Sequence, residues 1–158
     1  MRLLFVHADR MWYRVGRKGE SAEDIPQSMR EAELTDCLVA FSCVELYDEE
    51  NPAEAAEQMF EEVTKMLETL KSDRVFIFPF AHLSQNLSKP EVALGILKEV
   101  EKRLAKKGAT VVRAPFGWNK KFGLESKGHP MAVQSRSLCP KAAECRRRCP
   151  YCDRPLTV

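Results

Sequence analysis

Two stretches of this sequence begin like α-helices, and each of them lies between two strand-like runs. In the first stretch, Asn51 can cap the helix, Pro52 suits its first position, and Glu54 stands where a capping-box carboxylate belongs. The second stretch repeats this pattern, with Ser88 as the expected cap and Pro90 in the first turn. A helix that connects two strands in this way is typical of folds in which helices cover a β-sheet.

Apolar residues recur at helical spacing after both starts, so each helix has one apolar face. This face extends to Leu70 in the first helix and to Leu104 in the second, where Gly108 is a suitable C-terminal stop. The strand-like runs are short, apolar segments, several of them rich in β-branched or aromatic residues. They cover residues 2–8, 37–46, 74–80, 110–114, 122–126 and 131–138.

The remaining segments are polar. Residues 14–36 contain glycine, proline and mixed charges, which predicts a long loop with one helical turn near residues 28–33. Residues 127–130 read Lys-Gly-His-Pro and predict a turn that joins the last two strands as a hairpin. The whole order predicts an α/β fold: a mixed β-sheet that carries two long helices on one face.

The chain has 158 residues, which suits one ordinary folding domain. It contains no apolar run of membrane-spanning length, and a strand-like segment rather than a signal peptide follows Met1, so we expect a cytoplasmic protein that has no membrane partner. The net charge is +2, and the part from Cys139 onward carries more basic than acidic residues. The nearly neutral remainder does not predict broad electrostatic capture of nucleic acid.

Candidate chemistry lies where two strands end. Residues 80–84 (Phe-Ala-His-Leu-Ser) leave the third strand, and residues 114–121 leave the fourth, so both segments can form walls of one pocket. From position alone, His82 is as well explained as a loop histidine bonded to backbone, and Lys120 as a solvated surface charge. A lysine held by its aromatic neighbours could instead point at a developing oxyanion. We find no Gly-x-Ser-x-Gly nucleophile motif and no phosphate-binding glycine loop.

Together these motifs resemble the N-terminal editing domain of archaeal threonyl-tRNA synthetases. The resemblance runs from Met1 to about Leu138. It is carried by the opening segment and by short motifs along the chain, at residues 2–9, 39–41, 44–45, 80–84, 89–90, 114–117, 122 and 127–130.

The resemblance implies a fold like that of D-aminoacyl-tRNA deacylases and a proofreading hydrolase that removes serine from mischarged L-seryl-tRNA(Thr). Its partners would be the serine-bearing 3′ end of tRNA(Thr), a second copy in a homodimer, and the synthetase catalytic domain in cis or in trans. Editing would require no cofactor, and ATP would be used only by a full-length synthetase. Two alternatives stay open: a free-standing D-aminoacyl-tRNA deacylase and a non-catalytic tRNA-binding appendage.

The resemblance also implies a set of site residues. Lys120 would hold the attacking water and the carbonyl oxygen, and His82 would orient the terminal adenosine or the ester. Catalysis in this family is thought to use the 2′-hydroxyl of the terminal ribose. The substrate pocket would be lined by residues from several segments: Val44, Ala81, Pro115, Phe116, Gly117, Asn119 and Val133. Two of them depart from the family pattern, since Asn119 replaces a common aromatic residue and Val133 a common carboxylate.

The end of the chain poses a separate question. Four cysteines, Cys139, Cys145, Cys149 and Cys152, follow a C-x5-C-x3-C-x2-C pattern, and four thiolates suit tetrahedral zinc. Only the last pair has the short spacing typical of zinc knuckles. We therefore expect an editing domain over residues 1–138, followed by a tail over residues 139–158 that is either a small zinc-binding element or a basic, cysteine-rich linker.

Overall fold

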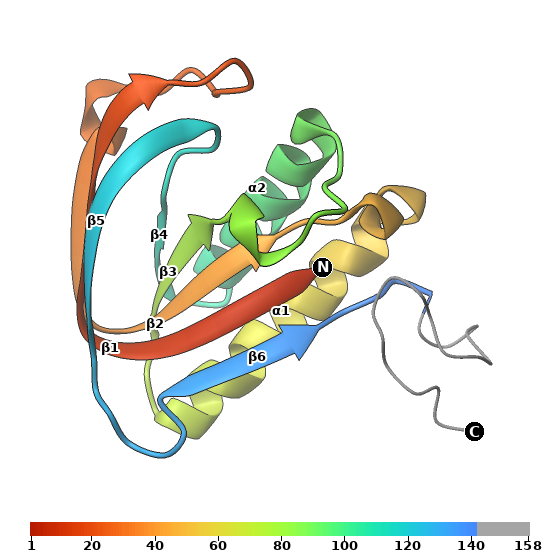
Figure 1. Ribbon diagram of the computed structural model, residues 1–158. Coiled ribbons are helices and arrows are strands. Elements are labelled where there is room, and N and C mark those ends of the chain that lie inside the picture. Colours follow the sequence, from red (N-terminus) through yellow and green to blue (C-terminus); the bar gives the residue numbers. More distant parts are fainter. Residues whose placement is uncertain (142–158) are drawn as a thin grey trace.

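The computed structural model describes residues 1–141 of the chain. Its strands and two long helices are arranged in one sheet with a helical layer (Figure 1). In chain order these elements are β1 (Arg2–Lys18), β2 (Glu31–Cys43), α1 (Pro52–Leu70), β3 (Arg74–Pro79), α2 (Pro90–Lys106), β4 (Thr110–Arg113), β5 (Trp118–Ser126) and β6 (Val133–Ser137). Three short 3-10 helices cover Gln27–Met29, Leu46–Glu50 and Ala81–Leu83.

The sheet is mixed, as predicted. Its order is β4-β3-β2-β1-β5, and β6 also pairs with β1. The two strand pairs connected through the helices, β2–β3 and β3–β4, are parallel, whereas all partners of β1 run antiparallel to it. Both helices lie on the same side of the sheet (Figure 1). The predicted fold class is therefore confirmed.

The long loop predicted over residues 14–36 is wrong. β1 continues to Lys18 and β2 begins at Glu31, and the two extensions pair with each other. Ion pairs join the exposed sides of these extensions: Arg10 with Glu33 at 2.7 Å and Arg14 with Glu31 at 2.9 Å. Their many charges therefore mark the solvent face of a strand pair, and only the short segment between Lys18 and Glu31 is a connection.

The hairpin predicted for the last two strands is also wrong. β5 pairs with the second half of β1, from Ala8 to Lys18, while β6 pairs with its first half, from Arg2 to Val6. The two strands thus follow one another along the same edge of β1 and do not pair as a hairpin. A register shift lies between Ala8 and Arg10, at the start of the region that pairs with β5, and irregularities of this kind bend strands. Beyond this point the sheet curves over itself (Figure 1).

Of the two predicted helix caps, the structure confirms one. The Asn51 side chain accepts a hydrogen bond from the Glu54 amide at 3.1 Å, as predicted for a cap. In α2, however, the N-cap is Lys89, and its side chain makes no capping hydrogen bond. Ser88 is buried and its amide donates to the Val44 carbonyl, so this residue joins the loop to β2 instead. Gly108 follows α2 with a φ of 102°, as expected of a glycine stop.

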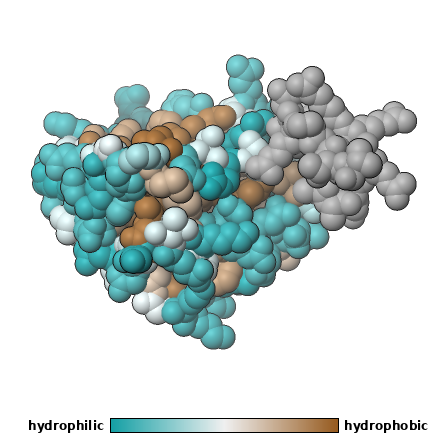
Figure 2. Space-filling view, turned by 90° about the horizontal axis from the view of Figure 1, so that it is seen from below, coloured by the Kyte–Doolittle hydropathy of each residue, from teal (hydrophilic) through white to brown (hydrophobic). Residues whose placement is uncertain are grey.

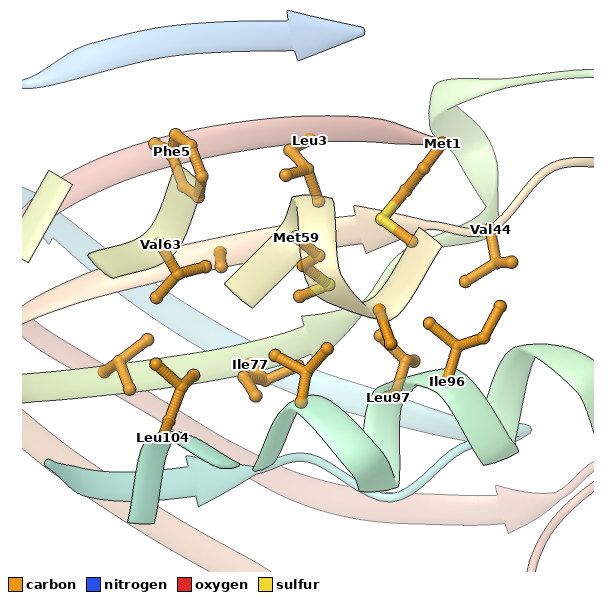
Figure 3. Close-up of a cluster of buried hydrophobic side chains, with 14 of the residues drawn as sticks. Met1, Leu3, Phe5, Val44, Met59, Val63, Ile77, Ile96, Leu97 and Leu104 are labelled. Atoms are coloured by element: carbon orange, nitrogen blue, oxygen red, sulfur yellow. The ribbon is translucent and has the colours of Figure 1, made fainter. Parts of the chain in front are cut away.

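The main core lies between the helices and the sheet. It is built from apolar side chains of β1, β2, β3, α1 and α2, all of them nearly inaccessible to solvent. Figure 3 shows Leu3 and Phe5 of β1 above Met59 and Val63 of α1, with Ile77 and Leu97 below. Burying a side chain of this size stabilises the fold by about 1.5–3 kcal/mol, so this layer fixes where the strand ends lie.

The opposite face of the sheet is covered by the curved part of the sheet itself. Tyr13 of β1 packs edge-on against Phe76 and Phe78 of β3, with ring centroids 5.8 and 6.5 Å apart. This second cluster continues through Phe41 to the aromatic side chains at the ends of β2 and β3. Seen from below, the outer surface is mostly hydrophilic, with hydrophobic atoms in small patches (Figure 2). Within residues 1–141, neither helix is long and apolar enough to cross a membrane.

Candidate active site

A pocket of about 520 Å³ opens where the curved sheet meets the start of α2. Its walls are the ends of β2 and β3, the segment after β3, the first turns of α2, and the turn between β4 and β5 together with the start of β5. This volume suits a small organic group, because ligand pockets commonly measure about 300–1,000 Å³. The two strand exits singled out in the sequence do form walls of this pocket.

Most of the predicted site residues meet here. Those that line the pocket are Val44, Ala81, His82, Phe116, Gly117, Asn119 and Lys120. Pro115 is buried beside it, and its carbonyl oxygen accepts a hydrogen bond from Lys120. The structure does not bring Val133 to this group. That residue lies on β6, paired with Val6, and 56% of its surface is exposed.

Lys120 is the most constrained polar group of the pocket. Its Nζ donates to the carbonyl oxygens of Pro115 and Trp118, both at 2.7 Å, and lies 5.4 Å from the centre of the Phe78 ring. Burial lowers the pKa of this amine to about 8, while the Glu23 carboxylate acts in the opposite direction. The two carbonyls use two of the three N–H bonds of the ammonium group, which leaves one for a bound molecule.

His82 lies in the short helix after β3 and also lines the pocket. Its ring is exposed and packs edge-on against Phe80 at 5.3 Å. The loop around it is fixed from behind, since the Ser84 hydroxyl donates to the buried Glu45 carboxylate at 2.5 Å and the Cys43 thiol donates to the Ala81 carbonyl at 3.6 Å. An exposed imidazole on an anchored loop can contact a ligand that enters the pocket.

Further lining residues were not predicted individually, although Phe80 and Trp118 lie in the two segments expected as pocket walls. These further residues are mainly apolar or aromatic and come from five segments: Ser21, Ser42, Cys43, Phe78, Pro79, Phe80, Leu87, Ser88, Pro90, Ala93, Leu97, Trp118 and Phe122. The sequence does contain a signal for two of them. Trp118 and Phe122 alternate with Asn119 and Lys121 along β5, so they share a strand face with Lys120. The rest come together through the crossing of β2, β3 and α2, except Ser21, which belongs to the connection between β1 and β2.

The predicted zinc ligands cannot be assembled from the described residues. Cys139 is buried near the end of this part of the chain, and Cys145, Cys149 and Cys152 lie outside it. Within residues 1–141, no three histidine, cysteine or acidic side chains are grouped as metal ligands. The zinc site therefore stays a prediction about the tail.

Comparison with known proteins agrees with this geometry. The model of a family described as the archaea-specific editing domain of threonyl-tRNA synthetase matches residues 1–138. The threonine–tRNA ligase of Methanopyrus kandleri is 48% identical over 144 residues, which is 91% of this chain and 23% of that protein. The enzyme of Thermococcus kodakarensis is 42% identical over 144 residues, again 23% of its length. The chain thus spans less than a quarter of these relatives.

One solved structure shares the fold. The c-Myc DNA Unwinding Element Binding Protein superimposes with a TM-score of 0.57 over 87% of this chain and 99% of its own, at 11% sequence identity. At this identity the likeness concerns the arrangement of strands and helices only.

Proposed function

Because this chain belongs to the archaea-specific editing-domain family of threonyl-tRNA synthetase, a family of deacylases, we propose that its pocket hydrolyses the ester of L-seryl-tRNA(Thr). Serine lacks one methyl group of threonine, and a hydrophobic pocket gains only about 1–3 kcal/mol from such a group. A threonine-activating site therefore attaches some serine to tRNA(Thr). A second site that cleaves this product restores accuracy.

The placement of Lys120 is the observation that carries the proposal. Its ammonium group is held by two backbone carbonyls, against an aromatic ring, at the point where both strand exits face the same space. Hydrolysis of an ester places negative charge on the carbonyl oxygen in the transition state. A fixed cation in a poorly solvated pocket stabilises that charge without having to reorganise.

The reaction needs a water molecule, and no strong general base is provided by Lys120 or His82. In the proposed step the water oxygen attacks the ester carbonyl carbon while Lys120 donates a hydrogen bond to the carbonyl oxygen. The 2′-hydroxyl of the terminal ribose relays the proton of the water to the 3′ oxygen as the ester bond breaks. His82, which also lines the pocket, orients the terminal adenosine.

The substrate is tested with three charged tRNAs: L-seryl-tRNA(Thr), L-threonyl-tRNA(Thr) and a D-aminoacyl-tRNA. We expect the chain to deacylate the first and to spare the second. Turnover of the D-aminoacyl-tRNA alone would instead identify a D-aminoacyl-tRNA deacylase. Binding without turnover of any of the three would identify a non-catalytic tRNA-binding appendage.

The role of Lys120 is tested by Lys120→Met, which keeps the length of the side chain and removes its charge. We expect the rate of L-seryl-tRNA(Thr) hydrolysis to fall by ~100- to 1,000-fold, as for loss of an oxyanion-stabilising donor. Lys121→Met is the matched control, because the neighbouring lysine is exposed and absent from the pocket lining. Equal rates for the two variants would remove Lys120 from the mechanism.

We further propose that the chain works in the cytoplasm as a homodimer, together with a synthetase catalytic domain in cis or in trans. The catalytic-domain partner is supported by the relatives, in which the matching region is part of a longer threonine–tRNA ligase; the homodimer is an expectation from the family resemblance. In this proposal ATP is used by the catalytic domain alone. Light scattering of the purified chain measures the oligomeric state directly, and a monomeric mass would contradict the dimer.

A further inference from the structure

The connection between β1 and β2 contains a buried carboxylate, Glu23, that is hydrogen-bonded to the β4–β5 turn in the pocket wall. The side chain of Glu23 is 6% exposed. Its Oε1 accepts a hydrogen bond from the Phe116 amide at 2.8 Å, and the two carboxylate oxygens accept from the Arg113 guanidinium at 2.5 and 3.1 Å. Glu23 therefore joins the end of β4 to the turn that follows it through a bidentate, charge-assisted pair, one of the strongest hydrogen-bonding arrangements in proteins.

The backbone around Glu23 holds the same turn. The Glu23 amide donates to the Phe116 carbonyl at 3.2 Å, and its carbonyl accepts from the Trp118 indole at 2.9 Å. Gly117 makes this approach possible: it has a φ of 74°, and a Cβ there would come within 2.5 Å of Ala22. The segment around Glu23 is thus fitted closely to residues 116–118.

This turn supplies the two oxygens that hold Lys120. They are the carbonyl of Pro115, next to the Phe116 amide that Glu23 binds, and the carbonyl of Trp118, whose indole donates to the Glu23 backbone. Fixing the turn therefore fixes the lysine amine. We propose that Glu23 is a positioning residue for the deacylation reaction, holding the β4–β5 turn so that Lys120 points into the pocket; this inference rests on the proposed function.

The charge of Glu23 also supports the role of Lys120, because it favours the ammonium form of that side chain. Its negative charge raises the pKa of Lys120, whereas Arg113 lowers that pKa. Among residues 1–141, the other ion pairs of these two groups are Glu101 with Arg113 at 2.6 Å and Lys98 with Glu23 at 3.6 Å. His82 and Cys43 are the other titratable groups that line the pocket. Neutralising Glu23 leaves Arg113 less screened, so the pKa of Lys120 should fall further.

The decisive variant is Glu23→Gln, which keeps the shape of the side chain and removes its charge. With L-seryl-tRNA(Thr) we expect kcat to fall by about tenfold or more and KM to change by less than about twofold, because orientation is lost and binding is retained. Asp24→Asn is the matched control on the same segment, since the Asp24 side chain is 95% exposed and pairs only with Lys18 among the ion pairs of residues 1–141.

A second readout does not depend on catalysis. In lysine-labelled protein, NMR titration follows the Nζ-linked carbon of Lys120, and the Trp118 indole signal reports the contact with the Glu23 carbonyl. We expect a lower midpoint for Lys120 and a shifted indole signal in Glu23→Gln, with both unchanged in Asp24→Asn. Wild-type values of kcat, midpoint and indole shift in Glu23→Gln would overturn the positioning role.

Two further outcomes are distinguishable. If Glu23→Gln does not fold, Glu23→Asp replaces it. This variant keeps the charge, but its side chain is too short to reach Phe116 and Arg113 together. A reduced kcat with a near-normal Lys120 midpoint supports the positioning role, and a wild-type kcat opposes it. A wild-type chain that leaves seryl-tRNA(Thr) intact contradicts the proposed function, while the NMR titration still decides whether Glu23 controls Lys120.

Discussion

The protonation state of Lys120 determines which chemistry its pocket supports. Burial lowers the pKa of this amine from 10.5 to about 8, because the ammonium form loses its hydration inside the pocket. Near neutral pH the group remains mostly charged and can stabilise an oxyanion. Above the pKa it becomes a neutral amine, which is a weaker hydrogen-bond donor.

We therefore expect the enzymatic rate of L-seryl-tRNA(Thr) hydrolysis to fall as the pH rises through about 8. The fall approaches about tenfold for each further pH unit, as the ammonium form is titrated away. Rates are measured after subtraction of the hydrolysis that occurs without protein. In Lys120→Arg any remaining activity should lack this alkaline decline, because a guanidinium stays charged. A wild-type rate that keeps rising with pH would contradict a role for the ammonium.

Two histidines that do not line the pocket, His7 and His129, form a second titratable pair. His7 is buried, and its Nδ1 lies 2.8 Å from Nε2 of His129. The Met131 amide donates to Nδ1 of His129, so the proton of His129 is on Nε2 and is donated to His7. A second proton on His7 would replace this hydrogen bond by repulsion between two N–H groups.

The pKa of His7 is lowered from 6.5, chiefly by burial and further by Lys127 and His129, although Asp36 and Asp9 act against this. The unfolded chain thus takes up a proton near pH 6.5 while the folded chain resists it. Stability is fully present above pH 6.5 and is lost as the pH falls below it. Urea unfolding at several pH values measures this loss. His7→Asn keeps an acceptor for His129, and we expect it to flatten the profile; an unchanged slope would assign the loss to other groups.

Among the elements, α1 offers the cleanest test of a local contribution. Its cap depends on one hydrogen bond, from the Glu54 amide to Asn51. Asn51→Ala should lower the free energy of unfolding by about 1 kcal/mol, whereas Asn51→Asp retains an acceptor and should cost little. Both values come from denaturant midpoints at constant m-value. Equal destabilisation by the two variants would show that Asn51 acts by another route.

The two helices were predictable because their proline starts and apolar periodicity are local signals. The extended half of β1 also carried a local signal, since Met11, Tyr13 and Val15 face inward and alternate with outward residues. Its charges outweighed that alternation and led to a loop prediction. The pairing of β5 and β6 with β1 could not be predicted without the full length of β1. Two strands can share one edge of β1 only if β1 is long enough for both.

For the whole molecule, the sequence located the pocket but not its full lining. His82 and Lys120 lie in the two segments that the sequence indicates as pocket walls, but their roles come from the resemblance to the editing-domain family, because position alone explains them equally well as a loop histidine and a surface lysine. Cys43 and Leu87 line the pocket only because the sheet curves and α2 crosses behind it. Neither the curvature nor the crossing can be predicted from a local sequence pattern. Glu23 was missed for the same reason, as its partners Arg113 and Phe116 are about 90 positions away in the sequence.

The shared edge of β1 has a consequence for how the chain assembles. β1 is synthesised before the other strands of residues 1–141, yet one of its edges is completed only by β5 and β6, the last of these strands. Contacts between such distant segments close large loops and slow folding. On the ribosome, one edge of β1 therefore stays unpaired while more than 100 further residues are synthesised. During that interval the nascent domain is most exposed to mispairing with other chains, and its pocket, whose last wall is the start of β5, forms only at the end.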